Sequence, residues 1–124
     1  MKRQHPEAAL QKTVFGYLSA ALDPERAMFR MVENNPRSAI AGANAKRRGI
    51  RSGTPDVLIW WRKWGNHFGA IELKSDRGRQ SPAQRQFQIE FQRIDGCYAL
   101  CRNMDAVELA LAMWGVPMRT TRHA

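Results

Sequence analysis

The alternation of hydrophobic and polar positions is clearest in the middle of the chain. Val57 to Trp61 and Phe68 to Leu73 are short runs rich in β-branched and aromatic residues, which is typical of strands. The segment between them, Arg62 to His67, carries Gly65-Asn66 as a turn-forming pair. The pattern therefore predicts an antiparallel hairpin over residues 57 to 73.

Three other segments have apolar residues at helical spacing. Residues 6 to 22 begin with Pro6, which suits the first turn of a helix. A second helix follows Ser81, with Pro82 at its first position and Gln84 placed to close a capping box, and it runs to about residue 94. A last helix follows Asn103 and ends at Gly115. The positions expected to face the core are Leu10, Val14, Tyr17, Leu18 and Ala21, then Phe87, Phe91 and Ile94, and finally Val107, Ala110, Leu111 and Trp114.

The remaining elements complete an α/β domain. Ala27 to Glu33 and Cys97 to Arg102 have strand composition. Residues 34 to 53 are poor in large apolar side chains and are expected to form a long basic loop, while residues 118 to 124 are expected to be a frayed basic tail. The order helix, three strands, helix, strand, helix predicts a small mixed sheet flanked by helices in a single domain over residues 1 to 124, with a right-handed crossover if the last strand is parallel.

Size and composition limit the classes of protein. The chain has 124 residues, 44% hydrophobic and 25% charged, as expected of one globular domain. No apolar run approaches the length of a membrane helix, and no secretory segment opens the sequence, so a cytosolic protein is expected. Cys97 and Cys101 lie too far apart along a strand for a disulfide and are expected to be two buried free thiols.

The net charge indicates a polyanionic partner. The formal charge is +9 and the pI is about 10.6, and nucleic acid is the commonest partner of so basic a small protein. Arginine outnumbers lysine, which suits bidentate phosphate contacts. Two alternative interpretations stay open: the cations form a merely solvated surface, or the loop is disordered and has no function. The candidate nucleic-acid contacts are Arg37, Lys46, Arg47, Arg48 and Arg51 in the loop, and Arg77 and Arg79 after the hairpin.

The hairpin would gather charged residues at one end. A turn centred at Trp64 or Gly65 places Asp56 opposite Glu72 or Lys74, and the last two share a face of the sheet. Paired carboxylates suit Mg²⁺ or Mn²⁺, with a backbone carbonyl such as that of Leu73 as a further ligand. The lysine would hold an attacking water or neutralise a phosphoryl oxygen, which points to phosphodiester hydrolysis. The alternative is a turn-ending Asp56 and a solvent-exposed Glu72–Lys74 pair contributing about 0 to 1 kcal/mol.

Pro55-Asp56 followed by Glu72-Leu73-Lys74 is similar to the PD-(D/E)xK nuclease signature. With the surrounding RRGIRSGTPDVLIWW and GAIELKSDRGRQSPAQRQF, the chain resembles the VRR-NUC (virus-type replication-repair nuclease) branch from Glu7 to about Gly115. The resemblance implies a restriction-endonuclease-like αβββαβ core. It also implies Asp56 and Glu72 as metal ligands and Lys74 as the catalytic lysine.

The resemblance extends to two further side chains and to the substrate. It implies that Glu7, in the early Glu-x-x-x-Gln helix, reaches the site and that Gln84 lies near it. From position alone, Glu7 could equally be an acid that complements the helix N-terminus. The family suggests a Mg²⁺- or Mn²⁺-dependent endonuclease acting on DNA, often branched or four-way junctions. It also suggests a homodimer and, for a viral member, the cytoplasm of a bacterial host.

Two other functional interpretations stay open. A nuclease fold can serve as a non-catalytic nucleic-acid-binding module, although all three central residues are present. A restriction-like or toxin nuclease would share the chemistry and differ in substrate. The tryptophans Trp60, Trp61 and Trp64 are candidates for stacking on splayed bases, with core or dimer packing expected for at least two of them.

Overall fold

Four helices and four strands form in residues 6–33, 39–49 and 51–120, the part of the chain that this computed structural model describes. In chain order they are α1 (Pro6–Ala21), β1 (Ala27–Met31), α2 (Ala39–Arg47), β2 (Val57–Arg62), β3 (Asn66–Leu73), α3 (Pro82–Arg93), β4 (Cys97–Cys101) and α4 (Met104–Trp114). None of the described helices is long and apolar enough to cross a membrane.

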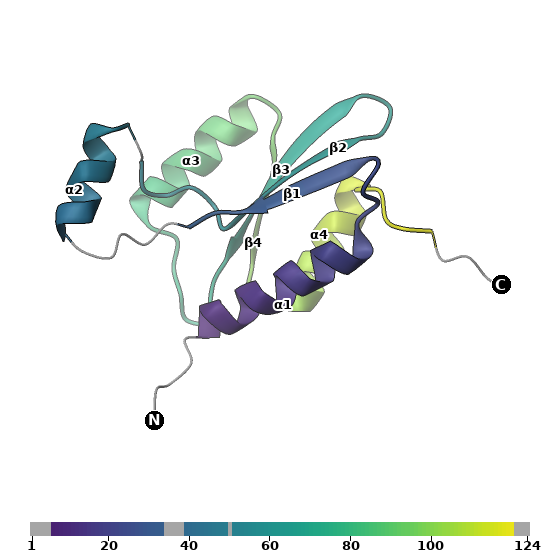
Figure 1. Ribbon diagram of the computed structural model, residues 1–124, viewed down its shortest axis with the longest axis horizontal. Coiled ribbons are helices and arrows are strands. Elements are labelled where there is room, and N and C mark those ends of the chain that lie inside the picture. Colours follow the sequence, from purple (N-terminus) through teal and green to yellow (C-terminus); the bar gives the residue numbers. More distant parts are fainter. Residues whose placement is uncertain (1–5, 34–38, 50, 121–124) are drawn as a thin grey trace.

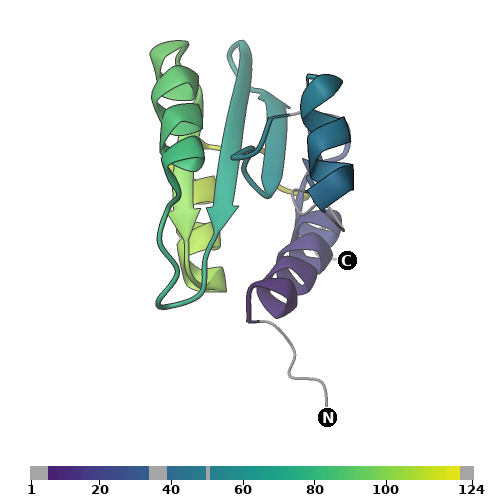
Figure 2. The ribbon, with the colours of Figure 1, turned by 90° about the vertical axis from the view of Figure 1, so that its left-hand side faces the viewer.

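The four strands form one open mixed sheet in the order β1-β2-β3-β4. The first three are antiparallel neighbours, and β4 lies parallel to β3 after the crossover through α3. Figures 1 and 2 show α1 and α4 on one face of the sheet and α3 on the other. The predicted α/β class, with a small mixed sheet flanked by helices, is confirmed.

The core lies between the sheet and the two helices α1 and α4. Val57, Ile59 and Trp61 alternate toward it from β2, as the period of two in a strand requires. Burying each such side chain contributes about 1.5–3 kcal/mol. The helices contribute the buried residues Val14, Leu18, Val107, Ala110 and Leu111, all of them predicted core positions.

The face covered by α3 is less well buried. No residue of α3 is fully buried, and its apolar contacts are made by Phe87 and Phe91, which are half-buried. The predicted inward position of Ile94 is wrong, because this residue is the C-cap of the helix and 64% exposed. The helix therefore packs through one aromatic stripe, and its first turn remains close to the end of β3.

The predicted loop over residues 34–53 is wrong in part, because it contains α2. Ala39–Arg47 is alanine-rich, and alanine has the highest helix propensity, which outweighs the single Gly42 in its interior. Lys46 and Arg47 lie in the last turn of α2, where cations complement the helix dipole. Arg37 and the rest of 34–38 lie outside the described residues.

The turn of the hairpin also differs from the prediction. Arg62 pairs with Asn66, so the turn is Lys63-Trp64-Gly65 and Asn66 already belongs to β3. Trp64 and Gly65 both have positive φ, at 54° and 125°, which a three-residue turn permits. The turn is therefore centred on Trp64, the first of the two positions considered.

Three smaller expectations need correction. β1 ends at Met31 rather than Glu33, although the Val32 N–H still donates to the Asp56 carbonyl. The expected frayed tail is partly ordered, because Met118 bridges to Leu22 and the Arg119 N–H donates to the Ala21 carbonyl. Both cysteines are free as expected, but only Cys101 is buried.

Candidate active site

A cavity of about 220 Å³ opens where β2 begins and β3 ends. The antiparallel pairing of β1, β2 and β3 brings the end of β1, the residue before β2 and the end of β3 together there, and α1 and α3 add side chains from either side. The lining residues are Glu7, Gln11, Val32, Glu33, Asp56, Glu72, Leu73, Lys74 and Gln84. The sequence-predicted residues Glu7, Asp56, Glu72, Lys74 and Gln84 therefore meet in one cavity.

Asp56 is held in place through both carboxylate oxygens. β2 pairs Val57 with Ile71, so one further step along the hairpin places Asp56 opposite Glu72. Oδ1 of Asp56 accepts a hydrogen bond from the Gln11 amide at 2.8 Å, and Oδ2 accepts one from the Leu73 N–H at 2.7 Å. This carboxylate thus links α1 to β3, and its orientation is fixed before any ligand binds.

Glu72 is a buried charged side chain, with only 1% of its surface exposed. Oε1 accepts a hydrogen bond from the Gln84 amide at 2.8 Å, and Oε2 accepts one from the Tyr98 hydroxyl at 3.0 Å. In the described residues no ion pair within 4 Å joins it to Lys74. The alternative of a solvent-exposed Glu72–Lys74 pair is therefore wrong.

Both carboxyls are shifted toward the protonated form. Burial raises the pKa of Glu72 to about 7, the charge of Asp56 adds to the shift, and the Tyr98 hydrogen bond opposes it. Burial also raises the pKa of Asp56, against the hydrogen bonds from Leu73 and Gln11. The charge of Glu7 raises the pKa of both, and a cation beside the two carboxyls would favour their ionised forms.

Glu7 and Lys74 approach the same cavity from different elements. Glu7 Oε1, in the first turn of α1, accepts a hydrogen bond from the Ser75 N–H at 3.3 Å. Lys74 is half-buried and contributes favourable charge to both Asp56 and Glu72. Both positions considered for Glu7 are observed together, because it lies in the first turn of α1 and its carboxylate also lines the cavity and caps the segment that follows β3.

Gln84 has two structural roles at once. The side-chain Oε1 of Gln84 accepts a hydrogen bond from the Ser81 backbone N–H at 2.7 Å. The backbone N–H of Gln84 donates to the Ser81 hydroxyl at 3.1 Å, which completes the predicted capping box. Its amide NH₂ remains free to donate to Glu72. The start of α3 therefore fixes the orientation of a carboxylate on β3.

The donor set suits a hard divalent cation. Asp56 lies just before β2, and Glu72 lies on β3. Each of their four carboxylate oxygens accepts one hydrogen bond and therefore keeps a lone pair for a cation. Mg²⁺ is typically held by one or two carboxylates and keeps several waters. In the described part of the chain no group of three or more His, Cys, Asp or Glu side chains is placed to hold a metal ion, so a cation bound between these two carboxylates would need other oxygens or water as its remaining ligands.

Four residues near the site were not among the predicted ones. Gln11 follows Glu7 by four residues on α1, so the helical period signals it. Glu33 lines the cavity because β1 runs antiparallel to β2. Tyr98, on β4, donates to Glu72, and Gln80 in turn donates to the Tyr98 hydroxyl at 3.0 Å. No sequence motif marks the last two, since their contacts depend on the parallel pairing of β4.

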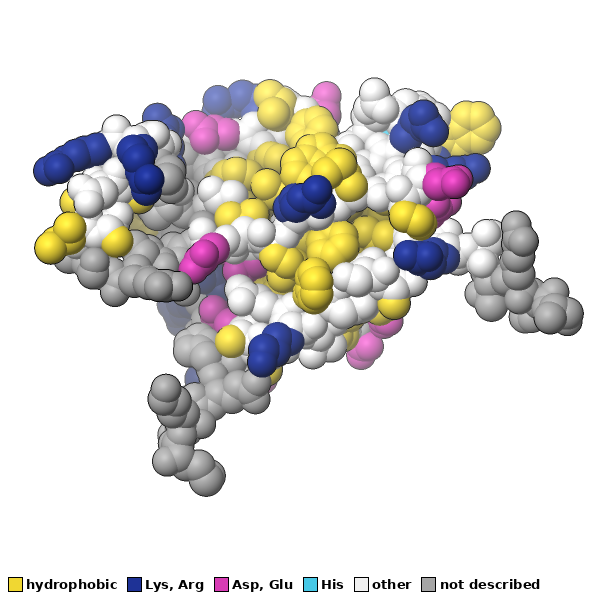
Figure 3. Space-filling view, in the orientation of Figure 1, with side chains coloured by type: hydrophobic (Ala, Val, Ile, Leu, Met, Phe, Trp, Pro, Cys, Tyr) yellow, Lys and Arg dark blue, Asp and Glu magenta, His cyan; other side chains and the backbone are white. Residues whose placement is uncertain are grey.

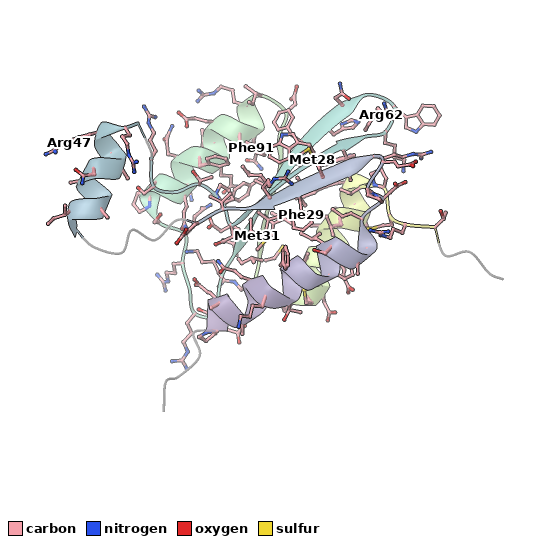
Figure 4. The ribbon with its side chains drawn as sticks, viewed as in Figure 1. Met28, Phe29, Met31, Arg47, Arg62 and Phe91 are labelled. Carbon is pink, nitrogen blue, oxygen red and sulfur yellow. The ribbon has the colours of Figure 1, made fainter. Side chains whose placement is uncertain are left out.

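The predicted nucleic-acid contacts are placed around the cavity rather than in it. Lys46, Arg47, Arg48 and Arg51 are exposed on and after α2, and Figure 4 shows Arg47 on that helix beyond the end of the sheet. Lys46 and Arg51 also line a cavity of about 780 Å³ that α3 borders. Arg77 and Arg79 are exposed in the segment after Lys74. Their contact with nucleic acid stays a prediction.

Comparison with known proteins agrees with this arrangement. The family model described as the VRR-NUC domain matches residues 3–105. A search of curated proteins finds no match. A solved structure described as a VRR_NUC domain protein superposes with a TM-score of 0.67 over 94% of this chain and 93% of that chain, at 17% identity, which shows a shared fold. Since the family model covers most of its length, the chain belongs to the VRR-NUC family, and a nuclease-type function follows.

Proposed function

We propose that the protein is a Mg²⁺- or Mn²⁺-dependent DNA endonuclease that hydrolyses phosphodiester bonds, with branched or four-way junction DNA as its substrate. The observation that carries the proposal is the meeting of Asp56, Glu72 and Lys74 in one polar cavity, with both carboxylates already oriented by hydrogen bonds. Such preorganisation is what stabilises a transition state rather than a ground state.

Asp56 and Glu72 would hold the cation, with the Leu73 carbonyl as a further oxygen ligand. A divalent cation bound there lowers the pKa of a coordinated water and offsets charge on the phosphoryl oxygens. Gln11 and Gln84 keep the two carboxylates in place, because each donates to one of their oxygens at 2.8 Å. These amides carry no charge, so they orient the acids without competing for the cation.

Lys74 follows Glu72 by two residues and lines the same cavity. An ammonium there would hold the attacking water and neutralise charge on the phosphoryl group as the bond breaks. Glu7 would act at the edge of the site, where its carboxylate fixes the Ser75 N–H and therefore the backbone that follows Lys74. Each predicted catalytic residue thus has a distinct part.

DNA fits the charge of the molecule. The chain carries +9, and the exposed cations of α2 and of the segment after β3 stand on either side of an acidic cavity. Cations around the site would bind the phosphates, while the carboxylates need a metal to accept a phosphate at all. A homodimer with two opposed sites would suit symmetric cleavage of a four-way junction.

The test is hydrolysis of a supercoiled plasmid and of a synthetic four-way junction, with Mg²⁺, Mn²⁺ or a chelator. The wild type should cut the junction with either metal and not with the chelator. Glu72→Ala and Lys74→Ala should lose at least about 100-fold in rate, the scale expected on removing one group from such a site. Glu90→Ala, an exposed acid on α3, is the matched control and should cut normally.

The alternative of a non-catalytic binding module makes the opposite prediction. Tight, salt-sensitive binding of the junction without metal-dependent cutting would support it and would overturn the proposed activity. Comparison of linear, nicked and branched DNA would separate a junction enzyme from a restriction-like one.

A further inference from the structure

We propose that the end of the sheet remote from the cavity binds unpaired nucleobases of DNA by stacking. This stacking surface consists of Met28, Trp60, Arg62 and Trp64, and it lies on the outer side of β1 and β2 and on the hairpin turn. The inference deepens the proposed function, since it names the structural feature of the DNA that the protein would recognise.

Large apolar side chains are left uncovered here. Trp64 is 98% exposed, Met28 is 47% exposed and Trp60 is 41% exposed. Met28, Trp60 and Phe68 are directly paired neighbours across three strands and so form one row on the outer face. Phe68 packs edge-on against Phe91 of α3, at 5.2 Å between ring centroids, whereas Met28 and Trp60 remain largely uncovered.

The figures show the same asymmetry. In Figure 4, Phe91 comes from α3 while Met28 lies on β1 and Arg62 at the hairpin end of the sheet. Figure 3 shows hydrophobic side chains gathered over the middle of this face, with Lys or Arg side chains among and beside them. Exposed aromatic rings beside cations, here Trp60 and Trp64 beside Arg62, are the arrangement that binds single-stranded nucleic acids, with bases on the rings and phosphates on the cations.

The hairpin turn is rigid. Trp64 has φ 54°, a conformation uncommon for a bulky residue. The His67 ring N–H donates to the Lys63 carbonyl at 2.8 Å, and the Lys63 N–H donates to the Gly65 carbonyl at 2.9 Å. Trp61 stacks between His67 and Trp114, which anchors the turn to the core. The protein therefore presents an exposed aromatic ring from a hydrogen-bonded turn whose backbone conformation is uncommon, as a preorganised contact would require.

Space for a base exists beside this ring system. A hollow of about 410 Å³ lies between the turn before β1 and the hairpin, and it is lined by Arg26, Met28, Trp60 and Arg62, with Glu25 as the acid of the lining. In the described residues Arg62 makes no ion pair within 4 Å. It is thus available to a phosphate beside a stacked base.

Unpaired DNA fits this surface better than a second copy of the chain. In a two-fold contact the surface would face itself, so the Arg62 guanidinium of each copy would face the same basic surface of the other. Like charges at an interface disfavour association, and the chain as a whole carries +9. A polyanion with aromatic bases satisfies both the charge and the exposed rings.

The position also sets a distance from the cavity. Trp64 lies eight residues beyond Asp56, which corresponds to about 25 Å of strand. A DNA strand rises about 3.4 Å per nucleotide, so the surface would engage bases about seven nucleotides from the phosphate at the cavity. It would therefore favour DNA that is unpaired near, but not at, the point of cleavage.

The test is fluorescence anisotropy with a labelled oligothymidylate of about 20 nucleotides, longer than the usual single-strand site, in chelator so that no DNA is cut. Trp60→Ala and Trp64→Asn should each weaken binding by about 5- to 100-fold, the range for loss of one stacked base. Asn tolerates positive φ, so the second variant keeps the turn. Trp64→Phe should retain most of the affinity.

Met113→Ala is the matched control, since Met113 is 77% exposed on α4 on the other face of the sheet. It should bind oligothymidylate like the wild type. Unchanged affinity in folded Trp60→Ala and Trp64→Asn would overturn the inference, as would variants that alter only the sedimentation of the protein. A wild type that binds but never cuts refutes the proposed function alone, so the two failures are distinguishable.

Discussion

At the scale of single residues, the site is built around an acid whose surroundings oppose its charge. Glu72 is 1% exposed, and burial raises its pKa to about 7. The unfolded chain would ionise this group near 4.5, so between these two pH values the folded state binds the extra proton. The stabilisation that Glu72 contributes by binding this proton is fully present below pH 4.5 and is lost as the pH rises through about 7.

Glu72→Gln should therefore stabilise the metal-free protein at pH 8. A pKa difference of about 2.5 corresponds to roughly 3 kcal/mol, and an amide that cannot accept from both Gln84 and Tyr98 loses about 1 kcal/mol of it. The variant should thus gain about 2 kcal/mol at pH 8 and lose about 1 kcal/mol at pH 4, where the wild-type acid is already neutral. Urea unfolding in chelator measures this difference.

Glu90→Gln serves as the control for the general effect of removing an acid, because Glu90 is exposed on α3. Its free energy of unfolding should follow that of the wild type within about 0.5 kcal/mol at both pH values. A Glu72→Gln variant that is less stable than the wild type at pH 8 would show that the carboxylate is better solvated than its burial indicates.

Tyr98 offers a second test at this scale, because its hydroxyl orients Glu72 from β4. Burial raises the pKa of Tyr98, so the hydroxyl remains a donor at every pH of use. Loss of such an outer contact typically costs 10- to 100-fold in metal affinity. Tyr98→Phe should weaken Mn²⁺ binding, measured by calorimetry, by about tenfold, with cutting largely restored at saturating Mn²⁺.

Tyr17→Phe is its counterpart, since Tyr17 is half-buried on α1 and packs against the core rather than the cavity. Mn²⁺ binding should be unaffected in this variant. Equal losses in both would indicate a general loosening of the fold instead of a contact to Glu72.

The residues differ in how far the sequence predicts them. Asp56, Glu72 and Lys74 follow from the period of a strand and the centre of one turn, which are local properties. Tyr98 reaches Glu72 only because β4 pairs in parallel with β3 after a helical crossover, and no local pattern specifies that register. The site's acids were predictable, whereas the residues that orient them from other elements were less so.

At the scale of elements, the start of α3 and the turn before β2 depend on one another. Gly53 has φ +93°, and a Cβ there would lie 2.6 Å from the Ala83 carbonyl carbon and 2.7 Å from its oxygen. Only glycine lets these two backbones approach so closely. Gln84 is the next residue along, so the contact sets the distance between α3 and Glu72.

Gly53→Ala should consequently cost stability and activity together. Strain at positive φ and overpacking against a backbone should together cost about 3 kcal/mol or more, and α3 should move away from Glu72. Urea unfolding and metal-dependent cutting measure the two effects. Gly49→Ala is the control: its φ is +85°, but nothing lies within 4 Å, so only about 1–2 kcal/mol of backbone strain is expected.

Two elements escaped prediction for opposite reasons. α2 was taken for a loop because its length and charge resemble one, although alanine favours a helix in Ala39–Arg47. The hairpin turn was assigned to Gly65-Asn66 because that pair commonly forms turns, whereas the structure accepts positive φ at Trp64. Tertiary pairing of Arg62 with Asn66 decided the turn, and sequence propensity did not.

At the scale of the whole molecule, cations and aromatics occupy different ends. Figure 1 shows α2 at one end of the long axis and the β2–β3 hairpin toward the other. Arg47 and Arg48 are exposed at the end of α2, while Trp64 is exposed on the hairpin. A DNA substrate would then meet a mainly electrostatic contact at one end and a mainly stacking contact at the other.

The salt dependence of binding should separate these two contacts. Each phosphate contact adds about 0.9 to the slope of log affinity against log salt for duplex DNA, so Arg47→Ala with Arg48→Ala should reduce that slope by about 1.8. Trp64→Asn should weaken binding to unpaired DNA without changing the slope, because a stacked ring releases no counterion. Anisotropy titrations at several salt concentrations, on duplex and single-stranded DNA in chelator, measure both. A slope that is unchanged in the arginine variant would place the phosphate contacts elsewhere, with Arg77 and Arg79 as the next cations to replace.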